Sequence, residues 1–171
     1  MRFDAEKTKV LVERFSSFRT TRGCAPPFEV LHPFMLLAGL EPQLLVAEFI
    51  QQKDDEPTLW NIASLDGSMV TVVSGVGPAR DWYLELHRGF MRRDEPAAQV
   101  DARTFPLNSV TGVRVSQTQY WGPPQLLEAN AGWVIEHDAG AFTLPGAGSD
   151  EAEEFAGIVL KTLKQRASSA G

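Results

Sequence analysis

The sequence contains a single cysteine, Cys24, among its 171 residues. One thiol excludes an internal disulfide and suits a reducing compartment, so we expect a cytoplasmic protein. The three histidines, His32, His87 and His137, do not stand at the short spacings of zinc-binding motifs, either to each other or to Cys24. We therefore expect no metal and no other cofactor.

Long apolar runs are also missing. The most apolar region, residues 30–50, is interrupted by His32, Pro33, Glu41, Pro42 and Glu48, which makes it too broken to span a bilayer. The first ten residues mix acidic and basic side chains where a secretory signal would be apolar. Both features favour a protein that is neither inserted in a membrane nor exported.

Motifs of familiar catalytic chemistry do not occur. Gly-Val-Gly-Pro at Gly75–Pro78 lacks the lysine and the helix start of a phosphate-binding loop. The acidic stretch Lys53–Glu56 lacks the pattern of a calcium loop, and no G-x-S-x-G nucleophile motif is present. We therefore predict that the protein is not an enzyme.

The charge is negative overall and unevenly distributed. The net charge is −6, yet residues 1–22 carry six basic and three acidic side chains, so the remaining chain carries about −9. Nucleic-acid binding requires a basic surface that displaces counterions, and the acidic body argues against it.

One basic cluster stands out in the body of the chain: His87, Arg88, Arg92 and Arg93, next to Phe90 and Met91. Such a loop is suited to touch an anionic surface. Asp94 and Glu95 follow at once, however, which favours a solvated loop between strands. We expect no stable membrane binding, because a few Lys/Arg residues contribute only about 1 kcal/mol each near an anionic membrane.

The N-terminal third is predicted to be helical. Asp4 is a suitable N-cap for a helix over residues 4–19, in which Leu11, Phe15 and Phe18 form an apolar stripe. A second short helix is expected at Val30–Gly39, because Gly39 and Pro42 would end it. We treat residues 1–43 as an N-terminal helical extension.

Residues 44–171 read as antiparallel strands followed by one helix. Leu44–Ile50 is apolar enough for either strand or helix, whereas Asp66-Gly67 between two strand-like runs (58–65 and 68–74) predicts a tight hairpin. A further strand is expected at Trp82–Arg88. After a loop over Arg92–Val100, two more are expected at Ala102–Leu107 and Val110–Gln119. A final hairpin should join Gly132–His137 to Ala141–Leu144. Hairpin linkage of this kind favours a meander.

The closing helix has the clearest signals in the chain. Ser149 or Asp150 can cap its start, where Asp150, Glu151, Glu153 and Glu154 suit the positive end of the helix dipole. An apolar stripe should be buried against the sheet; it consists of Phe155, Ile158, Val159 and Leu163.

Three sequence elements resemble the bacterial pleckstrin-homology-like family over roughly residues 58–166. They are Phe-Pro-Leu-Asn-Ser-Val-Thr-Gly-Val at Phe105–Val113, the Thr-Leu-Pro ending of the last hairpin at Thr143–Pro145, and the acidic start of the helix at Asp150. The resemblance implies an α+β fold, in which a strongly bent antiparallel sheet or near-barrel is closed by a C-terminal helix. It implies a binding scaffold and no particular chemistry.

From this resemblance we expect a non-catalytic module that docks a protein or peptide partner. The alternative is a small-ligand carrier or an enzyme that uses the open end of the barrel. Phosphoinositide binding in the family's first hairpin loop is not expected, because Asp66-Gly67 is short and acidic. The candidate binding residues are Arg88, Arg92, Arg93 and Trp121; the last is either a core residue or an exposed rim before Gly122. The oligomeric state is left open.

Overall fold

The computed structural model describes residues 3–18, 21, 25–50, 58–77, 99–121 and 128–169. Within the strands, the side chains of residues 58, 77, 117, 119–121 and 128–130 are outside the described structure. The expected strand at Trp82–Arg88 and most of the expected loop at Arg92–Val100 also fall outside the described residues, and both stay predictions.

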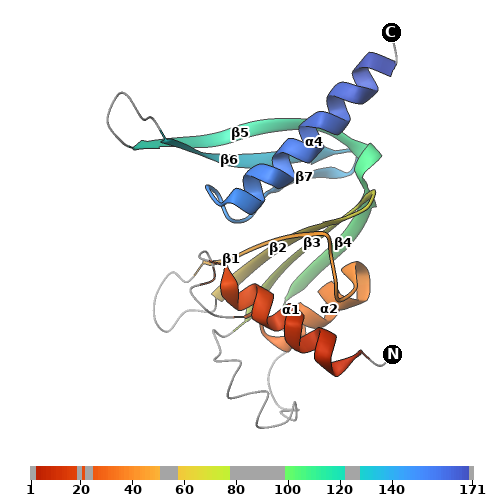
Figure 1. Ribbon diagram of the computed structural model, residues 1–171, viewed down its shortest axis with the longest axis vertical. Helices are drawn as coiled ribbons and strands as arrows, with labels where there is room; N and C mark the ends of the chain where they lie inside the picture. The colour runs from red at the N-terminus through yellow and green to blue at the C-terminus, as the bar shows by residue number, and fades with distance from the viewer. Residues whose placement is uncertain are drawn as a thin grey trace.

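The described strands form two antiparallel sheets with helices packed against them (Figure 1). Sheet A contains, in spatial order, β1 (Leu44–Ile50), β2 (Thr58–Asp66), β3 (Met69–Gly77) and β4 (Val100–Pro106). Sheet B contains β5 (Val110–Trp121), β6 (Glu128–His137) and β7 (Gly140–Thr143). Neighbours in each sheet follow one another in the described chain, so the predicted α+β class and the meander are confirmed.

Sheet A is covered on both faces. Helices α1 (Ala5–Ser17) and α2 (Phe28–Ala38) pack on one face, and sheet B and α4 (Asp150–Ser169) share a core with the other (Figure 1). Side chains alternate between the two cores, as the pleat requires: Leu45 and Ala47 point to the helices, and Leu44 and Val46 point to sheet B. Burial on both sides explains the apolar run Leu44–Ala47 of β1, which sequence periodicity could not assign.

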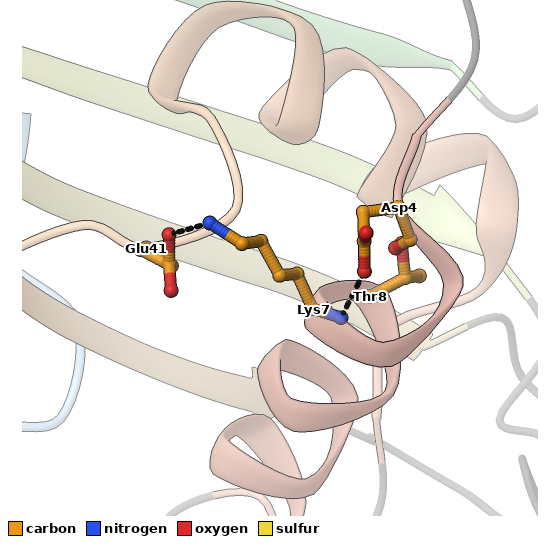
Figure 2. Close-up of polar contacts among 4 residues, drawn as sticks. All are labelled: Asp4, Lys7, Thr8 and Glu41. Atoms are coloured by element: carbon orange, nitrogen blue, oxygen red, sulfur yellow. Dashed lines mark hydrogen bonds and ion pairs between the residues drawn. The ribbon is translucent and has the colours of Figure 1, made fainter.

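Helix α1 begins where its cap predicts. Asp4 Oδ1 accepts a hydrogen bond from the backbone N–H of Lys7 at 2.9 Å, and the Thr8 hydroxyl donates to the Asp4 carbonyl at 2.7 Å (Figure 2). The Lys7 ammonium extends to the carboxylate of Glu41, between α2 and β1 (Figure 2). This ion pair raises the pKa of Lys7. The predicted helix over residues 4–19 is thus observed over 5–17.

The two N-terminal helices belong to a shared core with sheet A. Phe15 of α1 and Phe34 of α2 meet edge to face with ring centroids 5.6 Å apart, and both are fully buried. Trp60 and Ile62 of β2 complete this cluster from the sheet. Helix α2 approaches β3 closely at Gly75, where an added Cβ would lie 2.5 Å from Val30 Cγ2.

The β2–β3 hairpin forms as expected, with its turn one residue later than predicted. Asp66 pairs with Met69 and ends β2, so the two turn residues are Gly67 and Ser68. Gly67 has a φ of 55°, a conformation that glycine adopts at no steric cost. The glycine therefore takes the first of the two turn positions.

The sheets do not close into a barrel within the described residues. β4 and β5 are consecutive but belong to different sheets, because β4 ends at Pro106 and a 3-10 helix at Leu107–Ser109 separates it from β5. Proline has no N–H to extend the ladder, and the turn redirects the chain from one sheet to the other. The architecture is therefore two packed sheets with a C-terminal helix.

Helix α4 packs its apolar stripe against the core between the sheets. Phe155 and Val159 are fully buried, and Ile158 and Leu163 are half-buried against the same cluster. Ser149 is the cap, since its hydroxyl accepts from the backbone N–H of Ala152 at 3.2 Å. No described helix is both long enough and apolar enough to cross a membrane.

Candidate functional site

The residues proposed as binding residues from sequence are not placed by the structure. Arg88, Arg92 and Arg93 lie outside the described residues, and Trp121 ends β5 with its side chain outside them. Whether they form a site stays a prediction. The described residues bring a different set of polar side chains together.

A cavity of about 270 Å³ lies between the face of sheet A and strand β7. Three strands of sheet A contribute one wall, and β7 with Pro145 contributes the other. We call this space the intersheet cleft. Its lining residues are Asn61, Ile62, Val72, Val73, Ser74, Asp101, Arg103, Ala141, Phe142, Thr143 and Pro145.

Four polar residues cross sheet A in one row beside this cleft. The antiparallel register places Glu48 opposite Asn61, Asn61 opposite Ser74, and Ser74 opposite Asp101. Ser74 Oγ donates to Asn61 Oδ1 at 2.9 Å, and Asn61 Nδ2 donates to Glu48 Oε1 at 3.3 Å. We call this set the polar row. It shares its face with Val46, Ala63 and Leu65, which belong to the apolar core toward sheet B.

Glu48, at one end of the polar row, connects β1 to the segment before α4. Glu48 Oε2 accepts a hydrogen bond at 3.1 Å from the backbone N–H of Gly146, in the segment between β7 and α4. Gly146 has a φ of 73°, which brings its backbone around toward β1. Both Glu48 oxygens are thus used inside the protein, so this residue has a structural role.

The other end of the row faces outward. Arg103 Nε lies 4.0 Å from Asp101 Oδ2, and these side chains are 41% and 74% exposed. Ion pairs this long and this exposed contribute little to stability. Arg103 and Asp101 can therefore form hydrogen bonds to a bound molecule with little loss of stability from their own ion pair.

Two strand edges border the intersheet cleft. Among the strands described, β4 is one of the two outer strands of sheet A and β7 is one of the two outer strands of sheet B. Ala141 and Thr143 of β7 are exposed, whereas Phe142 between them is buried against Phe105. An edge strand presents backbone N–H and C=O groups that a further strand can pair with.

The described lining offers several hydrogen-bonding groups. Among the described lining residues the serine is Ser74, and its hydroxyl donates a hydrogen bond to the amide oxygen of Asn61. An amide oxygen cannot take the proton as a general base, so the hydroxyl is not activated for attack. Within the described residues no three His, Cys, Asp or Glu side chains gather to hold a metal.

A second hollow runs along the outward face of α4. It measures about 810 Å³, is open to solvent, and is lined within the described residues by a single helix from Gly157 to Ser169, including Lys161 and Lys164. Among the described residues the hollow has no wall opposite the helix, so these residues do not enclose a bound molecule.

Sequence reasoning did not select any member of the polar row as a site residue. The available signal was Glu48, the one polar residue in Leu44–Ile50, and Asn61, which stands between Trp60 and Ile62. Their convergence depends on the register of four strands, which residue patterns alone do not supply.

Comparison of the chain with protein-family models, with curated proteins and with solved structures gives no significant match.

Proposed function

We propose that the protein is a non-catalytic binding module of pleckstrin-homology-like, near-barrel architecture that docks an extended peptide segment of a protein partner at the intersheet cleft. Support for the architecture comes from a four-stranded and a three-stranded antiparallel sheet followed by a helix that packs between them. Strands followed by one packed helix are also what the resemblance of Phe105–Val113 and Thr143–Pro145 to the pleckstrin-homology-like family implies.

The observation that carries the docking proposal is the position of the polar row. Its outward end, Ser74 and Asp101, lies beside Arg103 and opens into a cleft flanked by the edges of β4 and β7. An extended peptide can pair its backbone with a strand edge and place one side chain in the adjoining pocket. This mode of recognition uses both features together.

The size of the cleft favours a side chain over a whole small molecule. Pockets for drug-sized ligands enclose roughly 300–1,000 Å³. The intersheet cleft, at about 270 Å³, lies below that range and has a mixed polar and apolar lining. The small-ligand carrier considered from sequence is therefore the less favoured occupant.

The negative net charge and the single cysteine are consistent with a protein partner in the cytoplasm. The net charge of −6 supports a protein partner over nucleic acid or a stable membrane contact, as both of those require a basic surface. A cytoplasmic location, favoured by the single cysteine, is part of the same proposal.

The test is selection of binding peptides from a random display library against the purified protein. We expect enriched peptides with dissociation constants on the order of micromolar. Thr143→Arg places a long side chain at the exposed mouth of the cleft and should abolish binding. The matched control is Thr118→Arg, at an exposed position of β5 outside the cleft lining, which should bind normally. Equal binding by both variants, or enrichment of no peptide, would refute the proposal.

A further inference from the structure

A buried histidine lies at the joint between the two sheets. His137, the last residue of β6, is only 6% exposed. Its ring stacks on Phe105 of β4, with centroids 4.2 Å apart and planes inclined by 14°. This contact therefore joins the β6–β7 hairpin of sheet B directly to an outer strand of sheet A.

The hydrogen bonding of His137 defines its protonation state. Nδ1 accepts a hydrogen bond from the backbone N–H of Ala139 at 3.3 Å, so this nitrogen carries no proton. The neutral ring must then carry its proton on Nε2, which is buried and has no hydrogen-bond partner among the described groups. The hydrogen bond from the Ala139 N–H to Nδ1 therefore favours the neutral form of the ring.

Adding a proton disrupts the hydrogen bond in the turn. A protonated Nδ1 would face the N–H of Ala139, so the turn would lose its side-chain hydrogen bond. Burial and the nearby guanidinium of Arg103 both disfavour a cationic ring, and Asp138 opposes them only in part. The pKa of His137 is accordingly lowered from its ordinary value of 6.5, with burial as the largest cause.

The other charged groups around the hairpin are already engaged. Arg114 of β5 pairs with Glu136 of β6 at 3.2 Å, and Arg166 of α4 donates to the carbonyl of Val110, the residue opposite His137. Arg103 on β4 and Asp138 in the turn are the charges coupled to the ring. Among these groups only Asp138 favours a proton on His137.

We propose that His137 is an acid-sensitive latch, whose protonation releases the β6–β7 hairpin from β4 and loosens the β7 wall of the intersheet cleft. The hairpin is suited to local opening because β7 has only four residues and pairs with β6 alone among the described strands. The inference concerns the hairpin itself and does not depend on what the cleft binds.

The direction of the pH effect follows from linkage. Below the ordinary pKa of 6.5, the opened state binds a proton that the closed state resists, so the closed hairpin loses stability as the pH falls. Above 6.5 both states are neutral at His137, and the closed form keeps its full stability. Below 6.5 the opening constant rises as the pH falls, by at most about tenfold per pH unit, and it levels off below the lowered pKa of the closed state.

Amide hydrogen exchange of the intact protein tests the latch. After correction for intrinsic rates, the amides of Asp138, Ala139 and Leu144 should exchange faster at about pH 5.5 than at about pH 7.5, by at most about tenfold. The β2–β3 hairpin should show no such change. His137→Gln keeps an acceptor but cannot titrate in this range, so it should abolish the acid response. His32→Gln, at a half-buried histidine of α2, should leave the response intact.

Two results would overturn the latch. One is the same acid response in the His137→Gln variant. The other is wild-type protein whose hairpin amides show no acceleration while the His137 ring, followed by NMR, becomes protonated. If His137→Gln does not fold, the wild-type comparison of ring titration with amide exchange decides alone, since the two must change over the same pH range.

Discussion

Asn61 on β2 donates a hydrogen bond to Glu48 on β1, directly opposite in the register, and Glu48 in turn holds the backbone N–H of Gly146. This connects the middle of sheet A to the segment that leads into α4. Glu48→Ala would leave the Gly146 N–H and the Asn61 amide without their acceptor. Hydrogen bonds to charged groups contribute about 1.5–3 kcal/mol, and we expect a loss of that order in the free energy of unfolding.

Urea denaturation measures this loss, and Glu41→Ala is the matched control. Glu41 pairs with Lys7 at the surface, with 67% of its side chain exposed, so its removal should cost less than about 1 kcal/mol. Equal costs for the two variants would show that the Glu48 connection does not stabilise the fold.

Gly75 should resist substitution because of the helix above it. In Gly75→Ala the new Cβ would meet the buried side chain of Val30 at 2.5 Å, so α2 must shift away from β3. Such overpacking costs about 1–3 kcal/mol. Gly157→Ala is the opposite case: it lies in α4 with nothing within 4 Å of the added carbon, and should stabilise by about 0.5–1 kcal/mol. Thermal unfolding of both variants checks the contrast; a destabilised Gly157→Ala or a neutral Gly75→Ala would disprove it.

The packing of α4 predicts a large effect at one position. Phe155 is fully buried in the core shared by the two sheets, and Phe155→Ala should lower the free energy of unfolding by about 3–5 kcal/mol. Leu160 lies on the face of α4 that lines the open hollow, so Leu160→Ala should lower the free energy of unfolding far less. A denaturation midpoint unchanged by Phe155→Ala would reject the packing of this helix.

Much of the fold was predictable because its signals are local. The cap at Asp4, the glycine of the β2–β3 turn and the apolar stripe through Phe155 each depend on residues within a few positions of one another. The turn shifted by one residue because Asp66 still pairs with Met69. The pattern of β1 was ambiguous because a strand covered on both faces loses its alternation.

The candidate site was not predictable for a physical reason. Glu48, Asn61, Ser74 and Asp101 come from four strands, and only the register aligns them into one row. His137 was considered as a metal ligand and set aside, whereas its stacking on Phe105 depends on the arrangement of the two sheets. Contacts between distant segments carry the functional geometry, and residue patterns report mainly on near neighbours.

Chemical-shift mapping of the labelled protein with a selected peptide locates the docking surface residue by residue. Docking at the intersheet cleft predicts that the largest amide shifts fall on Asp101–Arg103 of β4 and on Ala141–Thr143 of β7, and that Thr143→Arg removes them. Shifts centred on α4 between Gly157 and Ser169, with β4 and β7 unaffected, would contradict the claim and place binding on the outer face of the helix.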